Sequence, residues 1–577
     1  MKKYISSSYR ILKDEGVALF AKKVYEKIFK KNLSYDEWFQ FNLPQKQEID
    51  RQRKYQFRYM PLISIIVPVY NTPINFLYDM IHSVQKQTYS KWELCIANGS
   101  KDNLELLKAL ETIRDKDDRI KVKTLDNNEG IAGNTNEALS FAKGDYIALL
   151  DHDDVLNEEA LFRIVEAMQP SGIDVLYSDE DFLSGDGKTH IFPILKPDYS
   201  EELLCSHNYI THFFVVKKEI VDDIGGFSSK YDGSQDYDLI FKCIEKAKNI
   251  KHVPYILYHW RMHEASVAGD PNSKQYAYDA GKRAIEDHLK RIDADAEIGF
   301  ISGLHGMYHS RFQIVGNPKL SVIIAENNLP ICFEEVSRII DCYSNIEIIV
   351  IGKPQSGMPD LRNAKCAFKQ IEVPDDLSVA AKYNRGADAA DGEYLLFLNS
   401  GLTPVNGDAI KELLGCCCRK DVGVVGTKIL TPDNLIYHAG IVLGGKKGVN
   451  YPFQGIDNFS DGYLQRPRIN CNYSAVSGKA LLTSKQIFKQ VNGFDDRLDD
   501  SLYDVAFCMK ARKRKMRVVY CAHSQWKYAK DPKLSPRRSR MNRYNKKYLL
   551  RLSHYSDPFY NPNFEDASDI FAVSFKK

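Results

Sequence analysis

Three carboxylates stand close together in the sequence, at Asp151, Asp153 and Asp154, directly after the apolar run 146–150. Carboxylates this close raise one another's pKa, and a bound divalent cation removes the repulsion between them. Mg²⁺ and Mn²⁺ prefer such oxygen ligands and often complete their coordination shell with substrate phosphates. A D-x-D pattern in a surface loop is commonly only a solvated turn, but its position after an apolar strand favours a cation site.

A further carboxylate, Asp236, lies in the segment 233–240, where apolar residues at helical spacing predict a helix that begins near Gln235. Asp236 would then lie in the first turn of that helix. The backbone dipole favours an acid at this place, so helix capping alone would explain it. The alternative is a general base that accepts the proton of a hydroxyl group.

The segment 258–266 brings His259, Arg261 and His263 close together in the sequence. An imidazole could complete a metal shell, and the guanidinium group could hold a diphosphate. A lone histidine is more often structural, but two beside an arginine, in a chain that already offers carboxylates, indicate a site. These residues fit one reaction, in which a metal neutralises a leaving nucleoside diphosphate while Asp236 takes the proton of the attacking hydroxyl.

Alternating strand-like and helix-like segments would position these side chains. The apolar runs 63–69, 92–97 and 146–150 predict buried strands, and the stretch after the first run has the apolar spacing of a helix. This alternation predicts a mostly parallel, doubly wound α/β sheet, whose ligands bind beyond the carboxyl ends of the strands. Asn71, Asn98 and the acidic cluster all follow such strand ends.

The same pattern restarts in the second half of the chain. The run 320–325 resembles 63–68, and the run 391–398 resembles 143–150. The sequence therefore predicts a duplicated α/β domain rather than a solenoid of short repeats.

Composition limits the compartments and partners. The chain has 577 residues, a formal net charge of +3 and 12 cysteines without metal-ligand spacing. The charge is too small to indicate nucleic acid as the main partner, so we expect none, and scattered cysteines are typical of free thiols in a reducing cytoplasm. The apolar stretches are too short for a transmembrane helix, and residues 1–31 lack the apolar core of a signal peptide. We therefore expect a cytoplasmic protein.

Residues 9–31 predict an amphipathic helix whose apolar stripe is flanked by lysines. Two interpretations stay open. The helix either lies on the inner face of an anionic cell membrane, as a peripheral contact, or docks on the protein's own body. The polar stretch 42–59 that follows is predicted to be a linker.

The first half resembles the family 2 glycosyltransferases of the GT-A fold, and most closely the bacterial rhamnosyltransferase-like enzymes of surface polysaccharide synthesis. The resemblance covers about residues 60–270 and is carried by IVPVYN at 66–71, WELCIANGS at 92–100, NEGIA at 128–132, LLDHDD at 149–154, YSDED at 177–181, GSQDYD at 233–238 and YHWRMH at 258–263. It implies tandem GT-A domains, catalytic at 59–312 and duplicated at 313–535, after an N-terminal segment 1–58 and before a tail 536–577.

The resemblance implies an inverting transfer from a nucleotide sugar, with Mg²⁺ or Mn²⁺, to a growing, lipid-linked cell-surface polysaccharide. UDP- or dTDP-sugars are the expected donors, with dTDP-rhamnose as one candidate. The family usually has Asp-Gly-Ser where this chain has Asn98-Gly99-Ser100, so the choice of nucleotide base stays open. The implied roles are Asp236 as catalytic base; Asp151, Asp153 and His263 as metal ligands, with His259 as second choice to His263; Pro68, Tyr70, Asn71, Asn98, Gly130, Asp151 and Arg261 at the donor; and Asp179, Asn208 and His212 at the acceptor.

The second half resembles the same family over about residues 318–530, but its D-x-D position reads Asn399-Ser400-Gly401. Without these carboxylates a metal cannot be held in the usual way, so we expect a non-catalytic module that binds acceptor glycan or a partner. Asp504 survives at the position of the base, which keeps a bifunctional polymerase open. A third hypothesis, an inert glycan-binding scaffold, is opposed by the intact acidic residues of the first half.

Overall fold

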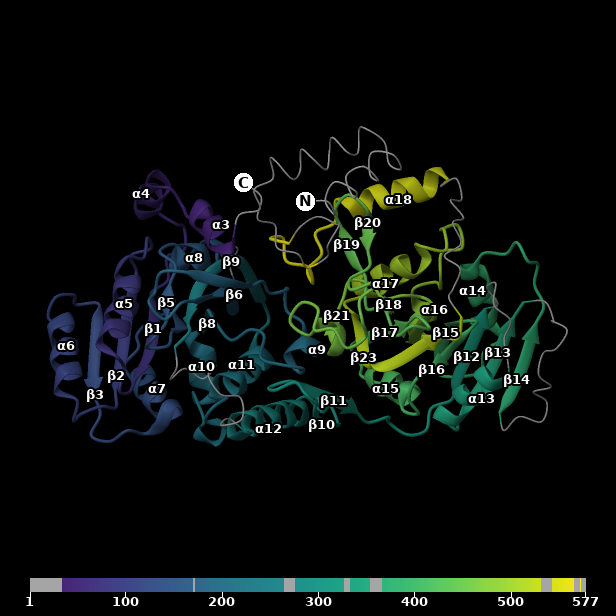
Figure 1. The fold of residues 1–577 in the computed structure, drawn as a ribbon, viewed down its shortest axis with the longest axis horizontal. Coiled ribbons are helices and arrows are strands. Elements are labelled where there is room, and N and C mark those ends of the chain that lie inside the picture. Colours follow the sequence, from purple (N-terminus) through teal and green to yellow (C-terminus); the bar gives the residue numbers. More distant parts are fainter. Residues whose placement is uncertain are drawn as a thin grey trace, which may run out of the picture.

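The computed structural model describes residues 34–169, 172–263, 275–325, 333–352, 366–530, 542–564 and Phe571. Two α/β modules lie side by side, the first drawn in purple to teal and the second in green to yellow (Figure 1). Each is built on one large sheet, so the predicted α/β fold class is confirmed. The predicted amphipathic helix at 9–31 lies outside the described residues. Among the helices that are described, none combines the length and the apolar character needed to cross a membrane.

The sheet of the first module contains β1 (Ile63–Val69), β2 (Trp92–Asn98), β3 (Ile120–Thr124), β4 (Tyr146–Leu149), β5 (Val155–Leu156), β6 (Val175–Leu183), β7 (His190–Ile194), β8 (Phe214–Lys217) and β9 (Ile250–Arg261). The order is β3-β2-β1-β4-β8-β6-β9-β5, with β7 paired to β6. The first four strands pair in parallel, whereas β8 runs antiparallel to β4 and β6. The sheet is therefore mixed rather than mostly parallel. Because β8 is reversed, the loop that precedes it lies at the edge where β4 ends.

The helices of the first module are α5 (Ile74–Gln85), α6 (Leu104–Arg114), α7 (Gly130–Ser140), α8 (Ala160–Ala167), α9 (Glu201–Leu204), α10 (Lys218–Ile224), the 3₁₀ turn η1 (Ser229–Tyr231), α11 (Gln235–Lys246) and α12 (Gln275–Arg291), followed by the hairpin of β10 (Ala296–Phe300) and β11 (Tyr308–Phe312). α5 buries Leu77, Met80 and Val84, which have the spacing that predicts it. α11 begins at Gln235, as predicted.

Two short helices, α3 (Tyr35–Asn42) and α4 (Lys46–Lys54), precede the first strand. Ser34 begins α3 with a capping box, in which its side chain and that of Glu37 accept each other's backbone N–H groups. α4 falls inside the stretch predicted as a linker, so that prediction is wrong there. The polar stretch is anchored by a tertiary contact, because buried Gln52 donates to Glu159 at 3.0 Å.

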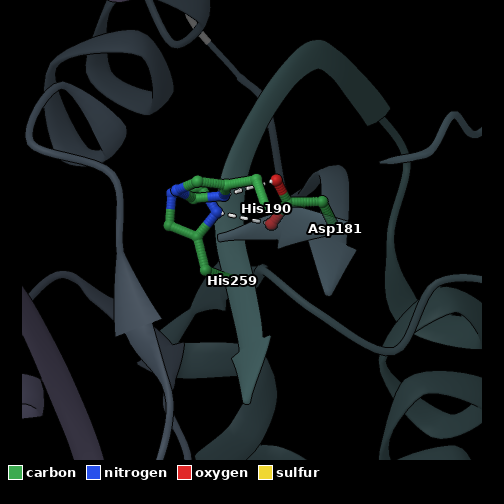
Figure 2. A group of neighbouring side chains, drawn as sticks. All are labelled: Asp181, His190 and His259. Atoms are coloured by element: carbon green, nitrogen blue, oxygen red, sulfur yellow. Dashed lines mark hydrogen bonds and ion pairs between the residues drawn. The ribbon is translucent and has the colours of Figure 1, made fainter. Parts of the chain in front are cut away.

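α3 is held against the first module by Asp181 of β6, because Tyr35 Oη donates to Asp181 Oδ2 at 2.6 Å. The Nδ1 atoms of His190 and His259 lie 2.8 and 2.6 Å from the two carboxylate oxygens (Figure 2). The Phe39 ring packs on these imidazoles, with its centroid 3.9 Å from that of His190. Asp181 is completely buried, and these hydrogen bonds compensate the desolvation of its carboxylate.

The sheet of the second module contains β12 (Leu320–Ala325), β13 (Ile346–Ile351), β14 (Ala367–Ile371), β15 (Tyr394–Asn399), β16 (Leu402–Pro404), β17 (Val422–Leu430), β18 (Ile436–His438), β21 (Cys471–Asn472), β22 (Ala480–Ser484) and β23 (Arg517–Tyr528). Its order, β14-β13-β12-β15-β22-β17-β23-β16, repeats that of the first module position by position. β12 takes the place of β1, and β15 takes the place of β4. The predicted duplication is therefore present in the strand topology.

The helices of the second module are α13 (Phe333–Cys342), α14 (Val379–Ala389), α15 (Ala409–Cys417), the 3₁₀ turn η4 (Arg466–Arg468), α16 (Lys485–Gln490), α17 (Tyr503–Lys513) and α18 (Arg543–Ser553), and β19 (Val442–Gly444) pairs with β20 (Gly448–Asn450). α18 belongs to the predicted tail, and it packs on the β19–β20 hairpin. At Gly448 the backbone φ is +72°, and a Cβ atom would lie 3.0 Å from the Leu549 carbonyl oxygen. Glycine therefore permits this close approach.

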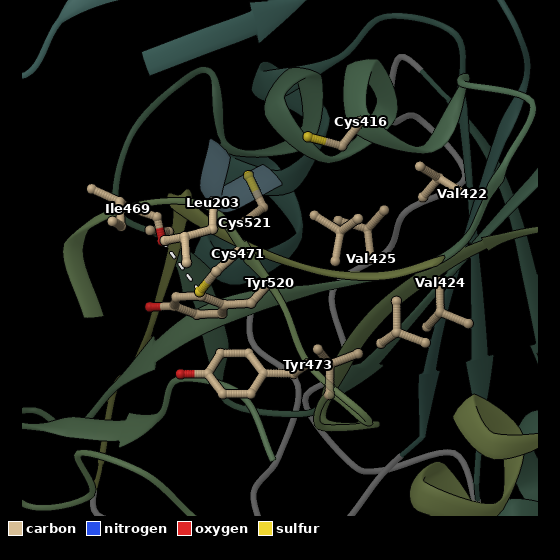
Figure 3. Packing of buried hydrophobic residues seen from close by; sticks show 14 of the residues in the cluster. Leu203, Cys416, Val422, Val424, Val425, Ile469, Cys471, Tyr473, Tyr520 and Cys521 are labelled. Carbon is tan, nitrogen blue, oxygen red and sulfur yellow. Dashed lines mark hydrogen bonds between the residues drawn. The ribbon is translucent and has the colours of Figure 1, made fainter. Parts of the chain in front are cut away.

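The hydrophobic core continues from the second module into the first. Leu203 of α9, in the first module, lies in the same cluster as Val424 and Val425 of β17 and the rings of Tyr473 and Tyr520 (Figure 3). All five side chains are at most 1% exposed. The cysteines that are described, several of which line this core, are free thiols.

A buried ion cluster joins the modules beside this shared core. Glu202 of α9 is 2% exposed, and its carboxylate lies 2.9 Å from Arg419 and 2.6 Å from Arg517 of the second module. Ser200 Oγ also donates to Asn472 Oδ1 at 2.8 Å. Buried charges are costly unless they are paired, so these contacts favour one relative placement of the modules.

We expect Glu202→Gln to lower the free energy of unfolding by about 3 kcal/mol, because it removes the nearest carboxylate of Arg419 and leaves Arg517 with only Glu201 and Asp421. Calorimetry of the full chain would report this loss as a lower Tm. Glu158→Gln is the matched control, since it removes only a solvent-exposed pair with Arg53 and should cost less than about 1 kcal/mol. Equal melting temperatures for the two variants would contradict a stabilising role for the cluster.

Candidate active site

A pocket opens at the carboxyl ends of β1 and β4, the edge of the sheet where the sequence predicts ligands to bind. It joins these strand ends to the first turns of α7, the loop before β8 and the start of α11. Among the predicted site residues, Pro68, Asp151, His212 and Asp236 line it. The full lining is Ile66, Pro68, Ile131, Thr135, Leu149, Leu150, Asp151, Thr211, His212, Phe227, Gln235 and Asp236.

Asp151 and His212 face each other across one side of the pocket. Asp151 Oδ2 lies 3.6 Å from His212 Nε2, and the Asp151 side chain is 51% exposed. The His212 ring stacks on Tyr258 with centroids 4.3 Å apart, and its Nδ1 atom lies 3.3 Å from Glu180. Burial alone would lower the pKa of His212, but interaction with the carboxylates of Asp151 and Glu180 raises it to about 10. His212 therefore carries a positive charge beside an open carboxylate.

Asp236 lies in the first turn of α11, on the same pocket. Asn208 Nδ2 donates a hydrogen bond to Asp236 Oδ2 at 2.8 Å and so fixes the orientation of the carboxylate. Burial raises the pKa of Asp236, and the charge of His212 opposes part of this rise. A carboxylate with a raised pKa is a better proton acceptor than an ordinary aspartate, so the arrangement suits a general base.

Asp153 pairs with His263 at the end of β9. Asp153 Oδ2 lies 2.8 Å from His263 Nε2, and both side chains are about one-fifth exposed, at 20% and 19%. Carboxylate oxygens and an imidazole are donors that Mg²⁺ and Mn²⁺ accept. The donor types and exposure of Asp153 and His263 fit the predicted metal. In the acidic loop, however, the possible ligand atoms that lie within 4.8 Å of one another belong to Asp151, Asp154 and His212.

Asp154, the third acid of the cluster, also has a structural role. It is 1% exposed, and its oxygens accept hydrogen bonds from Tyr258 Oη at 2.5 Å and from the Arg261 N–H at 2.8 Å. Burial, together with the neighbouring charges of Asp153 and Asp151, raises its pKa well above the ordinary value. Asp154 therefore ties the end of β4 to β9.

Arg261 does not take the predicted role at a diphosphate. Its guanidinium group is 1% exposed and donates to Asp79 Oδ2 at 2.9 Å and to the Asp153 carbonyl at 2.8 Å. It also lies over the Phe76 ring, 4.6 Å from its centroid. With its donors committed to the protein, Arg261 braces the backbone of the D-x-D loop. The prediction for Arg261 is wrong because its guanidinium group is bound by Asp79 and by the Asp153 carbonyl, both distant from it in the sequence.

His259, the second choice as ligand of the predicted metal, also lies elsewhere in the structure. It belongs to the Asp181 cluster that docks α3, not to the acidic loop (Figure 2). Asp181, His190 and His259 have ligand types that a metal could use. However, both oxygens of Asp181 already accept hydrogen bonds from the two imidazoles and Tyr35. The cluster is a satisfied structural network.

Asp179, which was predicted to bind the acceptor, is also occupied by hydrogen bonds within the protein. It is completely buried in β6, and its oxygens are bound by His252 at 2.9 Å, by the Lys196 N–H at 2.8 Å and by Asn561 at 2.8 and 3.0 Å. A glycan cannot reach it. Of the other two predicted acceptor residues, His212 lines the pocket, and Asn208 donates a hydrogen bond to Asp236, which lines it.

Apart from Asp151 and Arg261, the predicted donor residues lie at the ends of β1 and β2 and at the start of α7. Tyr70 is 48% exposed, and the Asn71 N–H donates to Ser100 Oγ at 2.7 Å. Asn98 is completely buried, and its Oδ1 accepts the Ser100 N–H at 3.0 Å. It therefore shapes the turn that carries Ser100. Gly130 begins α7 with φ of +76°, a conformation that favours glycine.

At the positions of the second module that correspond to the acidic loop and to Asp236, the side chains form hydrogen bonds within the protein. Asn399 Oδ1 accepts a hydrogen bond from Tyr383 Oη at 3.0 Å. Asp504 is 8% exposed, and its carboxylate accepts the Gly478 N–H at 2.8 Å. These groups are committed to internal contacts, whereas Asp151 and Asp236 face an open pocket.

Sequence reasoning missed two residues beneath the pocket, Glu180 and Lys196. Lys196 Nζ lies 3.1 Å from Glu180 Oε2 and donates to the Ile210 carbonyl at 2.7 Å and to the His212 carbonyl. Lys196 is 1% exposed. Glu180 falls in the YSDED motif, but only the fold shows that it faces His212.

Comparison with known proteins identifies the first module. Residues 64–225 match the family model described as Glycosyl transferase family 2, which spans the acidic cluster and the loop before β8. The chain is 30% identical over 543 residues to the uncharacterized protein y4gI of Sinorhizobium fredii, covering 89% of this chain and 59% of the relative. It is 28% identical over 507 residues to the O-antigen biosynthesis protein RfbC of Myxococcus xanthus, covering 85% and 39%.

A third relative matches a shorter region. The UDP-Glc:alpha-D-GlcNAc-diphosphoundecaprenol beta-1,3-glucosyltransferase WfgD of Escherichia coli is 29% identical over 236 residues, covering 40% of this chain and 89% of the relative. The chain spans only 59% of the length of y4gI and 39% of the length of RfbC. Residues 64–225 therefore form a domain that matches glycosyl transferase family 2.

Proposed function

We propose that the first module catalyses inverting transfer of a sugar from a nucleotide sugar to a hydroxyl group of a growing cell-surface polysaccharide. One observation carries the proposal: Asp236, with a raised pKa and a fixed orientation, shares a pocket with the open carboxylate of Asp151. The names of RfbC, an O-antigen biosynthesis protein, and of WfgD, a glucosyltransferase, support the polysaccharide assignment.

In this mechanism Asp236 accepts the proton of the acceptor hydroxyl as its oxygen forms a bond to the anomeric carbon. The bond from that carbon to the diphosphate breaks on the opposite side, which inverts the configuration. Asn208 holds the base in place, and Asp154 and Arg261 hold the D-x-D loop. A divalent cation, Mg²⁺ or Mn²⁺, bound by Asp151, Asp153 and His263 would neutralise the leaving diphosphate.

The donor and acceptor are narrower proposals. We propose a UDP- or dTDP-sugar, with dTDP-rhamnose as one candidate, bound along Pro68, Tyr70 and the turn that Asn98 shapes. We propose a lipid-linked acceptor, which the diphosphoundecaprenol substrate in the name of WfgD supports. The lysine-flanked segment 9–31 supports peripheral contact with the inner face of the cell membrane.

We propose that the second module does not transfer sugar. The loss of carboxylates at 399–401 and the internal use of Asp504 support this assignment. A bifunctional polymerase would need a second donor site, and an inert scaffold would leave the open acids of the first module without a role.

Asp236→Asn should lower the rate of sugar transfer by about 10²- to 10⁴-fold, because the amide cannot accept the proton. The measurement is release of nucleoside diphosphate from a panel of UDP- and dTDP-sugars in the presence of lipid-linked glycan from the source cells. Asp504→Asn is the matched control in the second module and should leave the rate unchanged. If Asp504→Asn changed the linkage or the rate, both modules would be active.

Asp153→Ala should weaken metal-dependent nucleotide binding by at least about tenfold, because it removes a carboxylate from the cation site. Calorimetric titration with UDP and with dTDP, with and without Mn²⁺, should show one metal-dependent site per chain. Asp222→Asn, an exposed acid paired with Lys218 on α10, is the control and should bind as the unmodified protein does. Two sites per chain would count against a non-catalytic second module, and no binding would favour the scaffold.

Transfer should fall at low pH, because Asp236 must be ionised and its pKa is raised by burial. Asn208→Ala removes the N–H group that stabilises the ionised carboxylate. The pKa of Asp236 should rise further, and the acidic limb of the pH–rate profile should move up by about one unit. Asn249→Ala, at the opposite edge of the sheet, should leave the limb in place. An unmoved limb in Asn208→Ala would assign it to another group.

A further inference from the structure

The residues 205–212, which we call the acceptor loop, control the geometry of the proposed site. Asn208 reaches Asp236 at 2.8 Å, and His212 lies 3.6 Å from Asp151. The same short segment therefore touches both the base and the acidic loop. A displacement of its backbone would change both contacts together.

Lys196 fixes the backbone of the acceptor loop from below. Its Nζ atom donates to the carbonyls of Ile210, at 2.7 Å, and His212, and lies 3.1 Å from Glu180. Glu180 in turn lies 3.3 Å from His212 Nδ1. Lys196 is only 1% exposed, so these partners take the place of water around its ammonium group.

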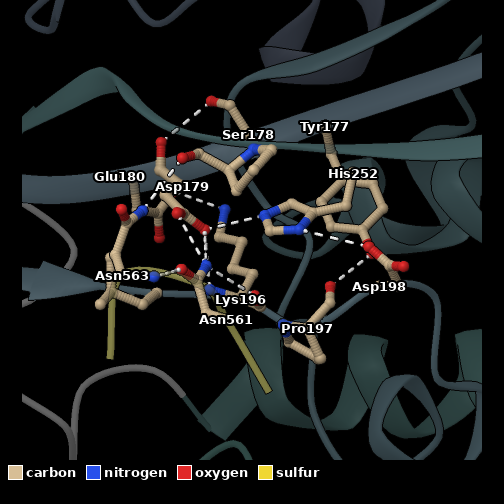
Figure 4. Close-up of polar contacts among 12 residues, drawn as sticks. Tyr177, Ser178, Asp179, Glu180, Lys196, Pro197, Asp198, His252, Asn561 and Asn563 are labelled. Atoms are coloured by element: carbon tan, nitrogen blue, oxygen red, sulfur yellow. Dashed lines mark hydrogen bonds and ion pairs between the residues drawn. The ribbon is translucent and has the colours of Figure 1, made fainter. Parts of the chain in front are cut away.

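Asn561, far along the chain, holds the backbone of Lys196 (Figure 4). Asn561 Nδ2 donates to the Lys196 carbonyl at 2.9 Å and contacts the oxygens of Asp179 at 2.8 and 3.0 Å. Asp179 also accepts the Lys196 N–H at 2.8 Å. Asn561 is 2% exposed, so one amide closes a buried ring of hydrogen bonds around the main chain of Lys196.

Other contacts from outside the first module hold the same stretch. The Asp198 N–H donates to the Pro558 carbonyl at 2.7 Å, and the Leu195 N–H donates to Tyr463 Oη at 2.7 Å. At the start of the acceptor loop, Ser206 Oγ lies 3.1 Å from the Asn470 carbonyl. The path from β7 to the pocket is therefore supported at successive points by the second module and the C-terminal segment 557–564.

We propose that Asn561 is a positioning residue for the active site of the first module. It acts through Lys196 to hold the acceptor loop, so that the second module and the C-terminal segment align a site to which they contribute no reacting group. The proposal rests on the function proposed above and assigns the second module a role in cis, beyond binding of glycan or a partner.

Asn561→Ala and Asn563→Ala test this in the full chain. Asn563 lies in the same segment, and its Nδ2 donates to the Pro254 carbonyl of the first module at 3.0 Å. Asn563→Ala is therefore the control. It removes a hydrogen bond from a side-chain amide to a backbone carbonyl, as Asn561→Ala does, but this bond does not involve Lys196. Similar melting temperatures for both variants would show that general stability is not the difference between them.

Hydrogen–deuterium exchange of peptides covering 205–213 is the first readout, because it needs no substrate. We expect faster exchange there in Asn561→Ala than in Asn563→Ala, with unchanged exchange in β1 and β2. The second readout is transfer. In Asn561→Ala, kcat should fall by about tenfold or more, because a small misplacement of reacting groups is costly, while binding of UDP or dTDP with Mn²⁺ is retained.

Equal exchange of 205–213 and equal kcat in the two variants would overturn the proposal. Faster exchange in Asn561→Ala from a protein that transfers no sugar would instead overturn the proposed function and leave the mechanical coupling standing. If Asn561→Ala does not fold, Asn561→Ser, which keeps one hydrogen-bond donor, should show a smaller change in the same peptides. Uniformly faster exchange across the whole chain in that variant would also count against a positioning role.

Discussion

Lys196 carries an ammonium group into the interior, directly beneath the pocket, and the arrangement above it depends on how that charge is compensated. Desolvation of such a group costs on the order of several kcal/mol unless partners replace water. Glu180 and the carbonyls of Ile210 and His212 do so. Burial lowers the pKa of Lys196, and the Glu180 carboxylate opposes that shift. The requirement to satisfy one buried cation thus fixes the backbone that presents Asn208 and His212.

The two modules share a fold but differ in the polar side chains at the ends of their strands. Their sheets have the same strand order because that order depends on buried apolar runs, which both halves retain. The site depends on a few polar side chains at strand ends, and these have diverged. At the end of β15, Asn399 accepts a hydrogen bond from Tyr383, whereas at the end of β4 Asp151 is open to the pocket. What the second module retains is a hydrophobic core and a set of polar contacts that face the first module.

Much of the fold followed from local patterns. The strands β1, β2 and β4 and the start of α11 were predicted because buried strands and amphipathic helices have distinct periodicities. β8 shows what local patterns cannot predict. A short apolar run indicates a strand but not its direction, and β8 is antiparallel to β4 and β6 only through its pairing with them. α4 shows another limit, because this polar segment forms a helix in which Ile49 and Gln52 are buried, and Gln52 bonds to Glu159 and Thr88.

By itself, the sequence determined the duplicated α/β fold and the placing of Asp151, Asp153 and Asp236 at element ends, because strand and helix signals are local. Only the tertiary structure decided which polar residues face the pocket. Arg261, His259 and Asp179 have the chemistry of a site, yet each is satisfied by partners distant in the chain. Lys196 and Asn561 gain their importance in the same way. Burial and hydrogen-bond partners are properties of packing between distant segments, and no local spacing of residues encodes them.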